Sequence, residues 1–146
     1  MNTIEHVVFD YNGTLAESGI IRSTTRERVR QLTELFSVHI ITADTFGTVV
    51  EQMNDLPVTL KILKDTDTGN AKEQYVKALG ADITACVGNG RNDICMCRRA
   101  VFSIAVIGKE GCYGKLLSVA TVAVTSIDDA FVLLLDPLKR KATTRE

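Results

Sequence analysis

The stretch Val7-Val8-Phe9-Asp10-Tyr11-Asn12-Gly13-Thr14-Leu15 joins an apolar run to a polar loop that contains glycine. The apolar residues before Asp10 are typical of a strand that is buried on both faces. Asp10 then lies at the carboxyl end of that strand. The polar segment that follows, Tyr11 to Ser23, is longer than a minimal connection between a strand and a helix, and loops of this kind often shape a site.

Further apolar runs of strand length follow along the chain, and segments of helical period separate them. With the first run included, the expected strands are Glu5–Asp10, Val38–Thr42, Thr59–Leu63, Ile83–Gly88, Ser103–Ile107 and Thr121–Thr125. This alternation predicts an α/β protein, a Rossmann-like three-layer sandwich with helices on both faces of a mostly parallel sheet. We expect a single domain over residues 1–136 and a basic, solvated tail over residues 137–146.

Capping residues and chain breakers set the expected helix boundaries. Predicted starts lie at Thr24-x-x-Glu27, which resembles a capping box, at Asp44, at Asn70-x-x-Glu73, near Asn92 and after Ser126. The helix that opens at Asn70 is expected to end near Gly80, and the one after Ser126 is expected to stop at Pro137. A further helix is expected over Tyr113–Val119.

Composition excludes several classes of protein. The chain has 146 residues, of which 45% are apolar, enough for a core without a disulfide or a structural metal. The formal net charge is −1, which gives no electrostatic reason to expect binding to nucleic acid or to a membrane surface. No apolar run approaches the roughly 20 residues of a membrane span, and no signal-peptide pattern begins the chain. We therefore expect a cytoplasmic protein.

The four cysteines are interpreted as free thiols. Cys86 falls in an apolar strand pattern, as a small core residue would. Cys95 and Cys97 are two residues apart on a predicted helix, which is the wrong spacing for a zinc knuckle.

Polar residues follow three of the predicted strands at their carboxyl ends. Asp10 closes the first strand, Thr42 the second, and the glycine-rich turn from Gly88 to Asp93 follows the fourth. In an open parallel sheet these ends share one edge, where ligands bind. Carboxylates there suit Mg²⁺, and the amides at the start of a helix suit a phosphate. Lys72, in the first turn of the helix predicted after the third strand, supplies a positive charge.

Four segments together resemble the motifs of the haloacid dehalogenase-like (HAD) superfamily. They are Val7–Leu15 for motif I, Ile40-Ile41-Thr42 for motif II, Lys72 for motif III and Gly88-Asn89-Gly90-Arg91-Asn92-Asp93 for motif IV. The last resembles in particular the version found in P-type ATPases, as does Thr42-Ala43-Asp44. The nearest resemblance is to small soluble proteins that look like an isolated P-type ATPase phosphorylation domain.

The resemblance implies a hydrolase, a Mg²⁺-dependent phosphatase that forms an aspartyl-phosphate on Asp10. The metal ligands it implies are Asp10, the backbone carbonyl of Asn12, Asn89 and Asp93. The residues implied to bind the phosphorylated substrate are Gly13, Thr42, Ala43, Lys72 and Asn92. It further implies a HAD-like core without a large cap, with only a short flap in which Leu15-Ala16 pairs with Ile20-Ile21. Such a bare site leaves room for a lid from a second copy, so a homo-oligomer is a possible assembly.

Two positions depart from the family pattern. Asn12 stands where phosphatases of the family have a second Asp that protonates the leaving group, and an amide cannot do so. Asn89 replaces a motif IV Asp and removes one negative charge from the metal site. These changes leave open a catalytically weak phosphate-binding or regulatory module, or a subunit of a larger transport system.

Several residues have a plainer interpretation as well. Asp10 can be a metal ligand without turnover, and Asp44 fits a helix cap better than a catalytic group. Arg91 fits a solvent-facing loop residue or a substrate contact. His6 and His39 are interpreted as structural. Lysines near Lys72 that compete for its role are Lys61, Lys64 and Lys77.

Overall fold

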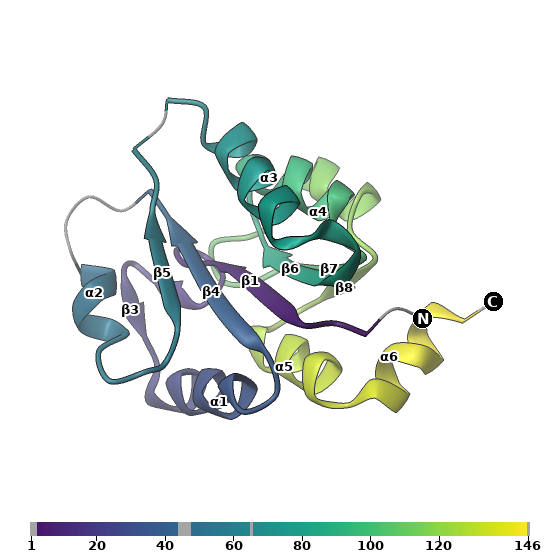
Figure 1. The fold of residues 1–146 in the computed structure, drawn as a ribbon, viewed down its shortest axis with the longest axis horizontal. Helices are drawn as coiled ribbons and strands as arrows, with labels where there is room; N and C mark the ends of the chain where they lie inside the picture. Colours follow the sequence, from purple (N-terminus) through teal and green to yellow (C-terminus); the bar gives the residue numbers. More distant parts are fainter. Residues whose placement is uncertain (1–2, 44–47, 65, 146) are drawn as a thin grey trace.

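The computed structural model describes residues 3–43, 48–64 and 66–145 (Figure 1). A six-stranded sheet runs through it in the order β5-β4-β1-β6-β7-β8, and every neighbouring pair is parallel. The strands are β1 (His6–Asp10), β4 (Ser37–Thr42), β5 (Thr59–Ile62), β6 (Thr84–Gly88), β7 (Phe102–Val106) and β8 (Val122–Val124). All the expected strands are present, with ends shifted by at most one residue.

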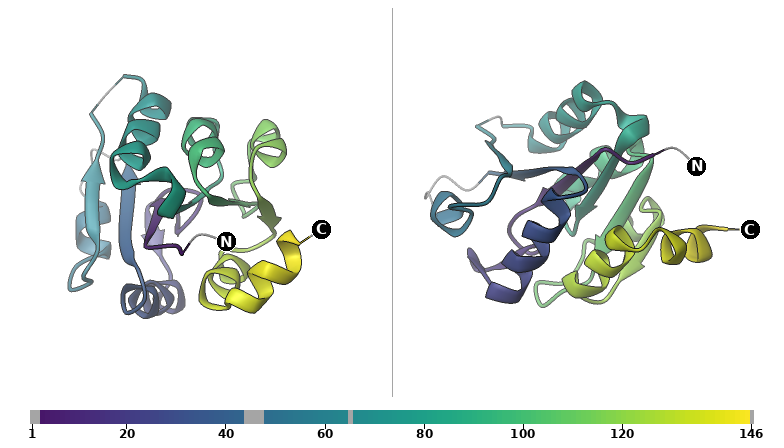
Figure 2. Two further views of the ribbon diagram at one scale, coloured as in Figure 1. Left: turned by 45° about the vertical axis from the view of Figure 1, so that its right-hand side comes forward. Right: turned by 60° about the horizontal axis from the view of Figure 1, so that its bottom comes forward.

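Helices cover both faces of the sheet, as Figure 2 shows. Successive residues of β1 point to opposite faces, so Val7 and Phe9 pack into one core and Val8 into the other. The first core includes residues of α1 (Ser23–Thr33) and α5 (Ile127–Leu135), and the second includes residues of α3 (Thr68–Leu79) and α4 (Ile94–Arg99). The predicted three-layer α/β architecture is therefore confirmed.

The segment after Asp10 forms the expected short hairpin, but its first strand lies one residue later than the predicted Leu15-Ala16. Strand β2 (Ala16–Glu17) pairs antiparallel with β3 (Ile20–Ile21), and the turn between them places Ser18 and Gly19 at positive φ. The Tyr11 hydroxyl donates a hydrogen bond to the Gly19 carbonyl, which ties the turn to the end of β1. Helix α2 (Thr48–Gln52) lies beside β3. The predicted cap Asp44 lies outside the described residues.

Two of the predicted helix caps are wrong. Helix α1 begins at Ser23 after Arg22, which makes no side-chain capping bond, so the Thr24-x-x-Glu27 capping box is not used. Helix α3 begins two residues before Asn70, because the side chain of Asp67 accepts the hydrogen bond from the Asn70 amide. Gly80 does end α3, and Ser126 does cap α5 by accepting from the Asp129 amide.

Short 3₁₀ helices replace parts of the expected α-helices. These are η2 (Arg91–Asp93), which precedes α4, and η3 (Gly114–Ser118), which lies where an α-helix was expected over Tyr113–Val119. A third, η1 (Ala81–Ile83), lies between α3 and β6, where no helix was expected. None of the helices in the described part of the chain has the length and apolarity needed to cross a bilayer.

The segment interpreted as a solvated tail instead contains helix α6 (Pro137–Thr144). Pro137 ends α5 and also occupies the first turn of α6, where its fixed φ is favourable. Asp136 caps α6 through the Leu138 and Lys139 amides. The Arg140 side chain is buried and donates to the Leu133 and Leu134 carbonyls at the end of α5. The basic segment is therefore a packed helix and not a solvated tail.

His6 and His39 lie in the body of the fold. The Nδ1 atom of His6 is 3.1 Å from Nε2 of His39, and Nδ1 of His39 is 2.7 Å from the Tyr75 hydroxyl. Burial, together with neighbouring His6, lowers the pKa of His39. The chain of contacts connects β1, β4 and α3, which supports a structural role for both imidazoles.

Candidate active site

The expected polar residues lie at one edge of the sheet. Asp10 ends β1, the central strand, and Thr42 ends the neighbouring β4, where Asp10 is in register with Ile41. On the other side of β1, Gly88 ends β6 and leads into the turn that carries Asn89 and Asp93. The topology thus brings together residues that are up to 83 positions apart in the chain (from Asp10 to Asp93).

Lys72 is the centre of the polar cluster. Its side chain is 1% exposed, and Nζ lies 2.9 Å from Asp10 Oδ1, 2.8 Å from Asp93 Oδ1 and 3.0 Å from Asn92 Oδ1. An ammonium group has three hydrogens, so these acceptors satisfy it fully. The competing lysines Lys61, Lys64 and Lys77 are all exposed. Lys72 is therefore the lysine that the fold directs to this edge.

Asp93 is fully buried behind Lys72. Its Oδ1 accepts from Lys72, and its Oδ2 accepts from the backbone amides of Asn89 and Gly90, each at 3.0 Å. Gly88 permits this arrangement, because a Cβ there would come within 2.5 Å of the Asp93 carboxylate. The turn after β6 is thus built around the Asp93 side chain.

Thr14 connects Asp10 to Asn89. Its hydroxyl lies 3.4 Å from Asp10 Oδ2 and 3.2 Å from Asn89 Oδ1, and its side chain is buried. Gly13, at φ +79°, allows Asn89 to approach, since a Cβ there would lie 2.4 Å from Asn89 Nδ2. Thr14 belongs to the stretch that resembles motif I, but the sequence pattern did not predict these contacts, because they depend on the loop conformation.

Three further predicted residues, Asn12, Thr42 and Ala43, lie at the same edge of the sheet. Thr42 is buried at the end of β4, and Ala43, the next residue, is exposed. Asn12 is exposed and forms an isolated bridge with Ala16 at the base of the hairpin. Side-chain hydrogen bonds and ion pairs connect Asp10, Thr14, Lys72, Asn89, Asn92 and Asp93 at this edge.

The cluster places two acids and one base close together in a small buried space. The pKa of Asp10 is raised to about 7, mainly because the carboxyl is buried and also because Asp93 is close, while Lys72 opposes both effects. Burial alone lowers the pKa of the Lys72 ammonium, but Asp10 and Asp93 together outweigh it and raise that pKa above its usual value. One negative charge is left uncompensated when both acids are ionised, and this favours the approach of a cation.

The donor set fits a hard divalent cation in kind. The Asp10 carboxylate and the Asn89 amide oxygen both contact the Thr14 hydroxyl, and oxygen ligands of these types suit Mg²⁺. Within residues 3–43, 48–64 and 66–145, no group of three His, Cys, Asp or Glu side chains is placed to hold a metal. A cation here would therefore rely on amide and carbonyl oxygens as well as carboxylate.

Comparison with known proteins gives one relative in sequence and many in structure. No family model matches the chain. The uncharacterized protein MJ0073 of Methanocaldococcus jannaschii is 33% identical over 87 residues, which are 60% of this chain and 84% of the archaeal protein. The chain belongs to the same family as MJ0073.

Solved structures place that family within a known fold. The cobalt-bound deoxy-D-mannose-octulosonate 8-phosphate phosphatase of Haemophilus influenzae superposes with a TM-score of 0.76 at 13% identity, over 99% of this chain and 94% of the other. The Moraxella catarrhalis 3-deoxy-D-manno-octulosonate 8-phosphate phosphatase, solved with magnesium, phosphate and its sugar, gives 0.73 at 20% identity over 90% and 86%. A HAD superfamily phosphatase of Bacteroides thetaiotaomicron gives 0.66 at 10% identity over 97% and 96%. The protein therefore has the HAD fold.

Proposed function

We propose that this protein is a phosphohydrolase that depends on a divalent metal, with Asp10 as the nucleophile and Mg²⁺ as the metal. The observation that carries the proposal is the buried Lys72 ammonium, held between the carboxylates of Asp10 and Asp93 at the ligand-binding edge of the sheet. The HAD fold, which the chain shares with phosphatases solved with magnesium or cobalt, supports the same function by analogy.

The reaction would proceed in two displacements at phosphorus. A carboxylate oxygen of Asp10 attacks the phosphorus of a phosphomonoester, an O–P bond forms, and the ester P–O bond breaks. The leaving oxygen keeps the bonding electron pair and takes a proton from solvent. Water then attacks the phosphorus of the aspartyl-phosphate, loses a proton, and releases inorganic phosphate and the Asp10 carboxylate.

The chain's own residues would position and neutralise the phosphoryl group. Lys72 holds Asp10 in place and offers its positive charge to the phosphoryl oxygens, and we assign the other phosphate contacts to Gly13, Thr42, Ala43 and Asn92. Asp10, the Asn12 carbonyl and Asn89 would hold Mg²⁺, which neutralises charge on the transferred group.

Asp93 keeps its expected place in the metal site as part of this proposal. Its Oδ2 accepts two backbone hydrogen bonds, but Oδ1 accepts one and retains a lone pair. Its negative charge also acts on any cation beside Asp10, even without direct contact.

The first test is hydrolysis of p-nitrophenyl phosphate, a substrate with a good leaving group, in the presence of Mg²⁺. Asp10→Asn should abolish turnover, because an amide cannot form the acyl phosphate. Asp129→Asn, at an exposed position on α5, is the matched control and should retain the wild-type rate. Hydrolysis that persists in Asp10→Asn would rule out Asp10 as the nucleophile.

Because Asn12 cannot protonate the departing oxygen, we expect slow turnover of substrates with poor leaving groups. Asn12→Asp should raise the hydrolysis of an alkyl phosphate at least tenfold, which is part of the factor of about 10²–10⁴ that general acid–base catalysis typically supplies. Asn54→Asp, another exposed asparagine, should leave the rate unchanged. An unchanged rate in Asn12→Asp would show that the missing acid is not the limitation.

A second candidate function is phosphate binding without useful turnover, in a regulatory module or in a subunit of a larger transport system. The exposed Asn12 and the use of Asn89 in place of a third acid favour it. The motifs also support a closer kinship with soluble proteins that resemble P-type ATPase phosphorylation domains. A beryllofluoride adduct on Asp10 without hydrolysis of any phosphate ester would favour this second function.

A further inference from the structure

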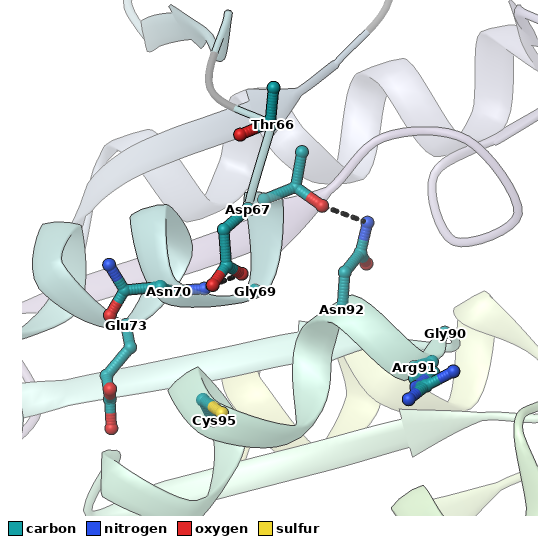
Figure 3. Close-up of a pocket in the computed structure, with 10 residues that line it drawn as sticks. Thr66, Asp67, Gly69, Asn70, Glu73, Gly90, Arg91, Asn92 and Cys95 are labelled. Carbon is teal, nitrogen blue, oxygen red and sulfur yellow. Dashed lines mark hydrogen bonds between the residues drawn. The ribbon is translucent and has the colours of Figure 1, made fainter.

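A polar groove borders the candidate active site between the amino end of α3 and the turn η2 that precedes α4 (Figure 3). Its volume is about 930 Å³. Residues 66–70 and Glu73 line one side, and residues 90–92 and Cys95 line the other. We call this hollow the α3–α4 groove.

Asn92 joins the groove to the active site. Its side-chain oxygen accepts from Lys72 Nζ at 3.0 Å, and its side-chain nitrogen donates to the Thr68 hydroxyl at 3.2 Å across the groove. Gly90, which also lines the groove, donates its amide to Asp93. A molecule whose phosphate lies against Asp10 and Lys72 would therefore meet the groove at Asn92.

The α3–α4 groove is lined by residues with polar or small side chains. Among its described residues, none has an aliphatic or aromatic side chain. Ligand pockets are usually lined mostly by apolar side chains, so this groove suits a molecule that binds through hydrogen bonds. Thr66, Asn70 and Arg91 offer hydroxyl, amide and guanidinium groups to such a molecule.

The two acids of the groove are already engaged. Asp67 accepts from the Asn70 amide, and Glu73 forms an ion pair with Arg99 at 3.3 Å. Neither is therefore a free charge for a ligand cation. Arg91 is exposed and has no ion pair within the described chain, so its guanidinium can donate to ligand oxygens.

A smaller hollow of about 400 Å³ borders Gly13 and Thr14 on the hairpin side of the site. Polar and charged residues such as Glu17, Arg22 and Asp128 line it as well, but Val106, Ile107 and Ile127 give it aliphatic side chains, which the α3–α4 groove lacks. An unpaired hydroxyl against such surfaces is unfavourable. A hydroxylated molecule would therefore be better satisfied in the α3–α4 groove.

We propose that the α3–α4 groove receives the leaving group of the substrate, and that this group carries several hydroxyl groups. Asn70 and Arg91 are then specificity residues, and Asn92 marks the junction with the phosphoryl site. This inference rests on the proposed phosphohydrolase function. It adds where the rest of the substrate lies and what chemistry it has.

The test compares inhibitors that differ only in hydroxyl groups. Glucose, mannose and fructose 6-phosphates and cyclohexylmethyl phosphate are all primary alkyl phosphates with a ring. Their Ki values are measured in competition with p-nitrophenyl phosphate, so that slow turnover of alkyl phosphates does not matter. We expect the best sugar phosphate to have a Ki at least tenfold below that of cyclohexylmethyl phosphate.

Substitutions in the two hollows show which of them produces the preference for hydroxylated inhibitors. Asn70→Ala and Arg91→Ala should each lower the ratio of the cyclohexylmethyl phosphate Ki to the sugar phosphate Ki by about tenfold. A change of this size corresponds to the loss of one hydrogen bond to a charged group, or of one whose loss leaves its partner unpaired. Arg98→Ala, at an exposed position on α4 outside the groove, should preserve the ratio. Lys109→Ala tests the smaller hollow, and a ratio that falls only in that variant would overturn the assignment to the groove.

Cys95 provides a readout that does not depend on turnover. It lines the groove and is partly exposed, whereas burial raises the pKa of Cys86 and Cys97 and suppresses their reaction with maleimides. In a Cys112→Ser background, a saturating sugar phosphate should slow N-ethylmaleimide labelling of Cys95 at least threefold more than inorganic phosphate does. Equal protection by the two would contradict occupancy of the groove.

The outcomes separate the two proposals. Hydrolysis of p-nitrophenyl phosphate with equal Ki values for sugar and cyclohexylmethyl phosphates would overturn the groove inference and leave the phosphohydrolase intact. Absence of p-nitrophenyl phosphate hydrolysis would overturn both.

Discussion

Lys72 forms ion pairs with two carboxylates that are largely withdrawn from water. The side chains of Asp10 and Asp93 are 13% and 0% exposed, so removing the ammonium leaves two like charges buried beside each other. Removing one partner of a buried ion pair typically costs about 3–5 kcal/mol. Lys72→Met should therefore lower the free energy of unfolding in urea by about that amount.

The matched control for this prediction is Lys77→Met, an exposed lysine on the same helix, which should change stability by less than about 0.5 kcal/mol. Adding Asp93→Asn to Lys72→Met should recover part of the loss, because one of the unpaired charges is removed. A loss in Lys72→Met no larger than that of the control would contradict the buried ion network.

The raised pKa of Asp10 predicts an unusual dependence of stability on pH in the metal-free protein. Its pKa is raised to about 7 in the folded state from 3.8, so between these values the folded protein binds a proton that the unfolded chain has lost. Stability from this group is fully present below pH about 4 and is lost as the pH rises toward 7. The total is on the order of 4 kcal/mol at most, since one pKa unit corresponds to about 1.4 kcal/mol.

The measurement is urea unfolding in EDTA at several pH values for wild type and Asp10→Asn. The difference between the two isolates the Asp10 contribution, because His6, His39 and the other titrating groups are common to both proteins. The wild type should lose stability relative to Asp10→Asn as the pH rises from 4 to 7. A flat difference, or one of opposite sign, would show that Asp10 ionises normally in the fold.

At the scale of elements, helix α6 depends on one buried contact with α5. Arg140 is 9% exposed and donates to the carbonyls of Leu133 and Leu134, which lie in the last turn of α5. A cation there satisfies carbonyls that the helix leaves unpaired and interacts favourably with the helix dipole. Arg140→Ala should therefore lower stability by about 1–3 kcal/mol.

Thermal and urea unfolding check this prediction, with Lys139→Ala and Lys141→Ala as controls because both side chains are exposed on the same helix. If the three variants are equally stable, α6 does not depend on the Arg140 contact.

The elements also show which parts of the fold could be read from the chain. Continuous apolar runs predicted the strands well, since burial on both faces leaves few alternatives. The helix starts were less certain, because several residues of capping type lie close together. Asp67 and Asn70 are three residues apart, so the amide of the second is the partner of the first, and the residue that caps depends on where the preceding loop ends.

At the scale of the whole molecule, the parallel sheet determines which residues meet. Its topology places the ends of β1, β4 and β6 side by side, so the convergence of Asp10, Thr42 and Asp93 could be predicted from the order of elements alone. Two features could not be predicted in this way: the contacts of Thr14, and the presence of the α3–α4 groove. They depend on the conformations of loops and on side-chain directions that no periodic pattern encodes.

The proposed phosphohydrolase function depends on a covalent bond between Asp10 and phosphorus. The most direct measurement is intact-mass and peptide mass spectrometry of protein mixed with acetyl phosphate and Mg²⁺, quenched in acid. We predict a single added phosphoryl group on the peptide that contains Asp10, released by hydroxylamine and missing in Asp10→Asn. A phosphoryl group on any other residue, or none on a protein that hydrolyses p-nitrophenyl phosphate, would contradict the account.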